Sequence, residues 1–114
     1  MVLLKMSSQS NLTKEFTAAM VDIYRRVVKD TGYRPTYFLQ MVIETSGHEA
    51  AMHLVHASQP SDGYTELYKR KRLDLTVEAL VLQPQWVSLF TEHDRATARK
   101  RLKDYEFDFA KHGL

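Results

Sequence analysis

Apolar side chains recur at helical spacing in most segments of this 114-residue chain, and one segment alternates as a β-strand would. In that segment, RLDLTVEALVLQPQW, every second residue from position 73 to 81 is apolar. The segment also fits one face of a helix that Asp74 or Thr76 caps and that Pro84 ends. Because no second segment offers a strand to pair with it, the sequence predicts an all-α fold.

The first long helix is the best defined of about six short-to-medium helices that we expect. It is predicted over about residues 12–30, with Asn11 as its N-cap and Gly32 as the left-handed residue after its end. Its buried stripe has the i, i+3, i+4, i+7 spacing of one helix face and consists of Phe16, Ala19, Met20, Ile23 and Val27. We expect one compact domain over residues 11–114, after a flexible lead-in at residues 1–10.

The second predicted helix lies in YRPTYFLQMVIETSG, with Pro35 in its first turn and Gly47 after its last. It has so little polar surface that we expect it to be central and covered on several sides. The last helix begins near Thr91, which resembles a capping box with Asp94. From the second helix to the last, the expected ranges are residues 33–46, 48–58, 61–72, 73–83 and 91–109.

The composition indicates a globular protein, with 44% hydrophobic and 26% charged residues. The chain has no cysteine, which excludes disulfides and thiolate metal sites and fits a cytoplasmic location. The apolar run in MVLLKMSSQSNL is too short for a signal peptide, and no apolar segment of about 18 residues is present to span a membrane. We therefore expect a cytoplasmic protein without a membrane partner.

The stretch GHEAAMH resembles the His-Glu-x-x-His helix of zinc proteases with one residue too many. His48 and His53 are five residues apart, or about 140° around a helix, so they cannot converge on one ion. Glu49, His53 and His56 lie within about 60° on one face instead. This trio is a candidate metal site, although an exposed polar face with a Glu49–His53 contact explains it better.

Two basic clusters are candidate phosphate-binding surfaces. The first is the run Lys69, Arg70, Lys71 and Arg72, whose side chains spread around the circumference of a helix. The second is formed by Arg99, Lys100 and Lys103, which share a side of the last helix. The net charge is only +2, from 16 Lys and Arg against 14 Asp and Glu, so ordinary solvated faces with i, i+4 ion pairs are the alternative.

Three aromatic residues accompany the first basic cluster, namely Tyr64, Tyr68 and Trp86. Tyr, Trp and Arg are enriched at the energetic centres of protein interfaces, so these rings are candidate partner anchors. The alternative is that they pack in the core, which is the usual fate of rings on apolar helix stripes.

The sequence contains no pattern typical of an active site. There is no nucleophile elbow, phosphate loop or Gly-rich fingerprint, and the 4 glycines lie in predicted turns or the tail. Asp74 and Glu78 come closest to a carboxylate pair in an apolar setting, but capping and a surface position explain them better. We therefore expect a protein that is not an enzyme and needs no cofactor.

Four segments resemble a family of small uncharacterised bacterial helical proteins and appended domains. They are RPTYFLQMV, SDGYTELY, RLDLTVEALVL and LFTEHDRATARKRL, and together the resemblance covers about residues 24–105. Some members of that family are associated with DNA restriction or defence. The resemblance therefore implies a binding or accessory role, and it is also compatible with an inhibitor of a defence system carried by a phage or mobile element.

These patterns together predict an interaction module that binds nucleic acid, or a protein complex that handles nucleic acid. The predicted binding residues are Tyr64, Tyr68, Lys69, Arg70, Lys71, Arg72, Trp86, Arg99, Lys100 and Lys103. A protein-directed inhibitor or adaptor that uses the same surface is the first alternative. A metal-binding protein built on Glu49, His53 and His56 is the second. A homodimer remains open, because so many aromatic residues can leave an apolar patch for a second copy.

Overall fold

A computed structural model describes the backbone of residues 2–114 and the side chains of residues 11–114. Every regular element in this part of the chain is a helix, so the all-α prediction is confirmed. None of these helices is long and apolar enough to cross a membrane. The α-helices are α1 Val2–Thr31, α2 Thr36–Glu44, α3 Gly47–His56, α4 Asp62–Lys69, α5 Val77–Val81 and α6 Glu92–Asp104. Short 3-10 helices follow α4, α5 and α6, namely η1 Leu73–Leu75, η2 Pro84–Leu89 and η3 Ala110–His112.

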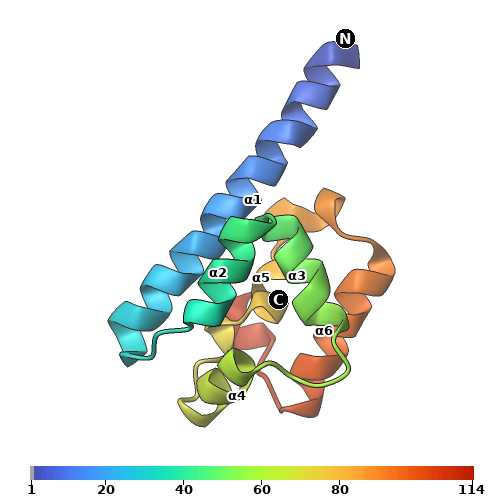
Figure 1. Cartoon of the computed structure of the whole chain (residues 1–114). Helices are drawn as coiled ribbons and strands as arrows, with labels where there is room; N and C mark the ends of the chain where they lie inside the picture. The colour runs from blue at the N-terminus through green and yellow to red at the C-terminus, as the bar shows by residue number, and fades with distance from the viewer. Residues whose placement is uncertain (1) are drawn as a thin grey trace.

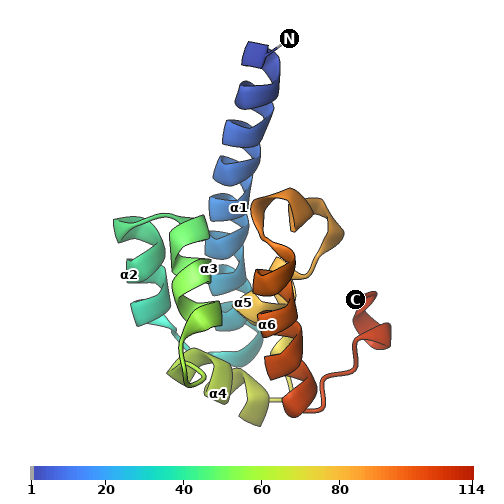
Figure 2. The same ribbon diagram turned by 90° about the vertical axis from the view of Figure 1, so that its right-hand side faces the viewer.

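The helix α3 occupies the centre of the arrangement and contacts α1, α2, α5 and α6. α2 and α6 flank it on opposite sides, and α4 lies across the lower end (Figure 2). α1 runs along the whole body, and its N-terminal end extends beyond the other helices (Figure 1). The molecule is therefore elongated, with extents of 47 × 27 × 26 Å.

The helix α1 begins at Val2, ten residues before the predicted start near Leu12. Residues 2–10 are therefore helical in backbone and not a separate lead-in, and Asn11 lies inside the helix. No proline or glycine interrupts these residues, and lengthening an existing helix is far easier than starting one. The other end was predicted correctly, because Gly32 follows with a left-handed φ of 77°.

The helix α2 lies at the edge of the molecule, which corrects the prediction that it is central. It packs on α1 and α3, but Tyr37 is 85% exposed and Ile43 is 71% exposed. Val42 is its one fully buried side chain. An apolar helix thus has a partner on only one face, which its composition alone did not reveal.

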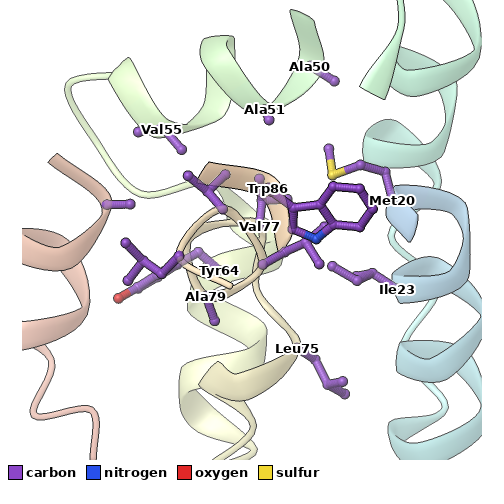
Figure 3. Close-up of a cluster of buried hydrophobic side chains, with 14 of the residues drawn as sticks. Met20, Ile23, Ala50, Ala51, Val55, Tyr64, Leu75, Val77, Ala79 and Trp86 are labelled. Carbon is purple, nitrogen blue, oxygen red and sulfur yellow. The ribbon is translucent and has the colours of Figure 1, made fainter. Parts of the chain in front are cut away.

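The predicted helix over residues 73–83 is confirmed as helical, but it is divided into η1 and α5. Thr76 separates the two and caps α5, accepting a hydrogen bond from the Ala79 N–H at 3.2 Å. All five residues of α5 are buried, and they form the middle of the core (Figure 3). The predicted capping box of α6 is also present: the side chains of Thr91 and Asp94 each accept a hydrogen bond from the backbone N–H of the other residue.

Gly47 begins α3, whereas the sequence had indicated a residue that follows the preceding helix. Its N–H donates a hydrogen bond to the Thr17 hydroxyl of α1 at 3.0 Å. A Cβ atom at this position would lie 2.5 Å from the Thr17 Cα. Glycine is therefore required here because two helix backbones approach closely, and not because of its conformational freedom.

Candidate functional site

The C-terminal ends of α1 and α4 meet at one end of the molecule. The Arg70 guanidinium lies over the Tyr33 ring, 5.6 Å from its centroid. Arg72 forms an ion pair with Asp30 in the last turn of α1, at 3.2 Å. These contacts place the predicted run of four basic residues beside the cations of α1 and of the α1–α2 connection. We call this surface the basic end, defined by Arg26, Lys29, Arg34, Lys69, Arg70, Lys71 and Arg72.

Two arginines of the basic end are held by carboxylates. Arg72 donates two hydrogen bonds to Asp74 besides its pair with Asp30, and these bonds to the Asp74 carboxylate raise the Arg72 pKa. Arg70 pairs with Glu66 at 3.5 Å. The other cations of the basic end form no ion pair within the described part of the chain, and all of them are exposed: Arg26, Lys29, Arg34, Lys69 and Lys71.

The second predicted basic cluster lies on α6. Arg99 and Lys103 are each two residues from Arg101, or about 160° around the helix, and Arg101 faces α3 and α5. Lys100 pairs with Asp104 at 2.9 Å, and Arg99 lies over the Phe109 ring of the C-terminal tail. Arg99, Lys100 and Lys103 are all exposed, as expected.

Two of the three predicted aromatic anchors are core residues, which corrects their assignment as binding residues. Tyr64 is 2% exposed, and its hydroxyl donates a hydrogen bond to the Arg101 carbonyl at 3.2 Å. Trp86 lies in the buried cluster (Figure 3), where it is 7% exposed, and its ring packs edge-on against Phe16. Both rings lie on helix faces that long-range packing covers. Tyr68 differs, because it is 45% exposed while one edge contacts Tyr105.

The predicted metal trio does not assemble. Nε2 of His56 lies 2.7 Å from a carboxylate oxygen of Asp94, and the His56 ring stacks on His93. Glu49 and His53 remain exposed. Among the described residues, no group of three or more His, Cys, Asp or Glu side chains is arranged to hold a metal ion. The helical spacing of the trio was sound, but Asp94, which lies far away in the sequence, pairs with one of its members.

Glu78 is buried, with only 3% of its surface exposed, which corrects the predicted surface position. Its carboxylate accepts a hydrogen bond from Arg101 at 3.0 Å. Arg101 also donates to the backbone carbonyls of Leu54 and Ala57 at the end of α3. Burial raises the Glu78 pKa and the bond from Arg101 opposes that rise. One glutamate inside the apolar run LTVEALVL was the available signal for a buried pair.

A cleft of about 530 Å³ opens beside the basic end. α1, α2 and α4 form its walls, and the segment from Leu75 to Glu78 also lines it. Tyr33 and Arg34 belong both to this cleft and to the surroundings of the basic end. The remaining lining side chains are mainly apolar and include Ile23, Val27, Phe38, Met41, Leu54 and Leu67.

Carboxylates influence the tyrosines that line the cleft. Burial raises the Tyr33 pKa, and the charges of Glu66 and Asp62 raise it further. Burial likewise raises the Tyr64 pKa, with a second contribution from Glu78. Asp62 is exposed at the start of α4 and forms no ion pair with any described residue. It is therefore an available hydrogen-bond acceptor in the lining of a mainly apolar cleft.

Comparisons with protein-family models, with curated proteins and with solved structures find no match to this chain. The resemblance to small bacterial proteins associated with restriction or defence therefore stays a prediction. The candidate sites rest on their own geometry.

Proposed function

We propose that this domain is a non-catalytic interaction module that binds nucleic acid through the basic end. The observation that supports this function is the gathering of five exposed cations without ion pairs where α1 and α4 end. Exposed, unpaired Lys and Arg side chains can contact phosphates and release the counterions condensed on them. The α6 face is a weaker candidate, because Lys100 is paired and Arg99 lies against the tail.

Exposed rings near these cations favour single strands. Tyr68 precedes Lys69 directly, and Tyr37 lies in the first turn of α2, three residues after Arg34. Their exposed fractions are 45% and 85%. Proteins that bind single strands combine a positive surface with rings on which bases stack.

Electrophoretic mobility shifts with duplex and single-stranded DNA, at low and physiological salt, test this function. The variant Lys69→Ala/Lys71→Ala should weaken binding and reduce the slope of log affinity against log salt by about one to two. Lys100→Ala/Lys103→Ala is the matched control, because it removes the same charge from the α6 face and should leave a smaller effect. The absence of any shift at low salt would overturn the proposal, since phosphate contacts are strongest there.

A protein-directed adaptor or inhibitor is the second candidate, and the exposed apolar residues of α2 favour it. Tyr37 and Ile43 of this short helix are the most exposed large hydrophobic residues of the described chain, at 85% and 71%. The partner would be a protein complex that handles nucleic acid, or a second copy of this chain.

Pull-down from a bacterial lysate before and after nuclease treatment distinguishes these functions. Partners bridged by nucleic acid should disappear after the treatment, whereas a directly bound protein should remain. The variant Ile43→Lys should release a directly bound protein while leaving DNA binding intact. Light scattering on the purified protein tests the homodimer, which the same variant should dissociate.

A further inference from the structure

The cleft beside the basic end is continuous with the proposed phosphate surface. The Tyr33 ring lies beneath Arg70 and also lines the cleft. Arg34 lines the cleft as well, is exposed and forms no ion pair within the described residues. A chain whose phosphates contact the basic end therefore passes the mouth of a space of about 530 Å³.

The size and lining of the cleft suit a flat organic ring. Its volume lies within the range of small-molecule sites, and such sites are mostly apolar with a few placed polar groups. Tyr33, Tyr37 and Phe38 contribute aromatic surface from the region around the start of α2. Aromatic and apolar walls of this kind hold nucleobases that have left a base stack.

The available polar group at the cleft is an acceptor. Of the two carboxylates in the lining, Glu78 is engaged by Arg101, whereas Asp62 has no ion-pair partner in the described chain. Carboxylates accept hydrogen bonds from the exocyclic amine of cytosine. Adenine and guanine also carry such an amine, but thymine offers only carbonyl oxygens and one ring N–H.

We propose that the cleft holds one unpaired, amine-bearing base of a single-stranded nucleic acid, while the flanking phosphates lie on the basic end. Arg34 holds the phosphate next to the inserted base, and Asp62 accepts a hydrogen bond from its amine. This inference rests on the proposed function and adds to it the strand state and the kind of base. Duplex DNA uses the basic end alone.

Fluorescence anisotropy with labelled oligo-dC, oligo-dT and duplex DNA of equal length tests this inference. The variant Met41→Trp fills the cleft and should weaken oligo-dC binding about tenfold, which is the loss of one stacked base. Duplex affinity should not change. Leu39→Trp is the matched control, because it adds the same side chain to α2 at a position that does not line the cleft.

The base preference is tested with Asp62→Ala. The wild-type protein should bind oligo-dC about fivefold more tightly than oligo-dT, and the variant should bring this ratio close to one. The ratio is informative because removing a carboxylate beside the basic end strengthens phosphate binding for both oligonucleotides equally. Glu92→Ala removes the same charge from the exposed start of α6 and should leave the ratio unchanged.

The outcomes separate this inference from the proposed function. If wild-type protein binds oligo-dC and Met41→Trp binds it equally well, the cleft does not hold a base, although the basic end still binds DNA. An equal affinity of the wild type for oligo-dC and oligo-dT overturns the role of Asp62. If no oligonucleotide binds at low salt, the proposed function itself fails. Thermal denaturation of each variant shows that loss of binding is not loss of folding.

Discussion

Two arginines show how differently similar ion pairs are placed in this protein. Arg101 lies in the buried junction of α3, α5 and α6, where its side chain is 12% exposed and that of its partner Glu78 is 4% exposed. Arg72 lies at the basic end, where its side chain is 32% exposed and its partners Asp30 and Asp74 are also partly solvated. Both arginines make several hydrogen bonds, so the number of bonds does not distinguish them.

The difference between them lies in what remains after one partner is removed. Water reaches Asp30 and Asp74 and can replace the lost guanidinium. Water does not reach Glu78, and the carbonyls of Leu54 and Ala57 would also lose their donor. The buried junction is therefore a structural element, whereas the ion pairs of Arg72 can be replaced by contacts with water.

The largest effect is expected from Arg101→Met, which should lower the free energy of unfolding by about 3–5 kcal/mol. Arg72→Met, the matched change at the basic end, should cost at most about 1 kcal/mol. Chemical denaturation of both variants at neutral pH measures this contrast. Equal losses would show that burial does not separate the two pairs.

A double variant and a pH series sharpen this first prediction. Glu78→Leu in the Arg101→Met background removes the unpaired charge and should recover much of the lost stability. Because the Glu78 pKa is raised in the folded state, protonation favours folding. The defect of Arg101→Met should therefore shrink as the pH falls toward the ordinary glutamate pKa and grow as the pH rises.

A smaller loss of stability is expected from a substitution at the close approach of α3 to α1. Gly47→Ala places a Cβ against the Thr17 backbone and should destabilise the fold by about 1–3 kcal/mol. Gly63→Ala, in α4, meets only the Ser61 hydroxyl at 3.8 Å and should stabilise its helix by up to about 1 kcal/mol. Thermal melts of the two variants should therefore shift in opposite directions.

The pH dependence of Asp94 provides a third contrast. Burial alone would raise its pKa, but hydrogen bonds from His56 and Thr91 outweigh burial and lower it. A lowered pKa stabilises the fold above the ordinary aspartate value, and this contribution is lost as the pH falls through the folded value. Asp94→Asn should therefore cost about 1–2 kcal/mol at neutral pH and flatten the stability profile below about pH 4.

Asp74→Asn is the matched control at the basic end. Its carboxylate is more exposed than that of Asp94, with 21% against 8% of the side chain accessible. We expect it to cost less than about 1 kcal/mol. Urea denaturation at neutral pH should show a larger loss of stability for Asp94→Asn than for Asp74→Asn.

The smallest change in stability is expected from a substitution in the turn after α4. Lys71 has a φ of 60°, a conformation that side chains with a Cβ adopt at a cost. Lys71→Gly should stabilise the fold by about 0.5–1 kcal/mol and weaken DNA binding, since it removes an unpaired cation. Gly32→Ala, at a φ of 77°, should instead destabilise by about 1 kcal/mol. A stability loss in Lys71→Gly would contradict the strain assigned to this turn.

Local features of the structure could be predicted from the sequence because their causes lie within one helical turn. Thr76 and the Thr91–Asp94 box cap the helices that follow them, and Gly32 ends α1 in the left-handed region. The all-α fold follows from the same kind of information, since a lone alternating segment has no strand to pair with. The exposure of the Lys69 run and of the α6 face could also be predicted from helical spacing.

The tertiary structure alone decided which faces are covered. Glu78 is buried because α3 and α6 enclose α5, and its partner Arg101 lies 23 positions away along the chain. Tyr64 and Trp86 became core residues for the same reason, while the apolar helix α2 remained at the edge. Helical periodicity defines faces but not their neighbours, and burial depends on neighbours that only packing supplies. For this reason the basic end and its cleft, assembled from α1, α2 and α4, could not be derived from spacing within any one helix.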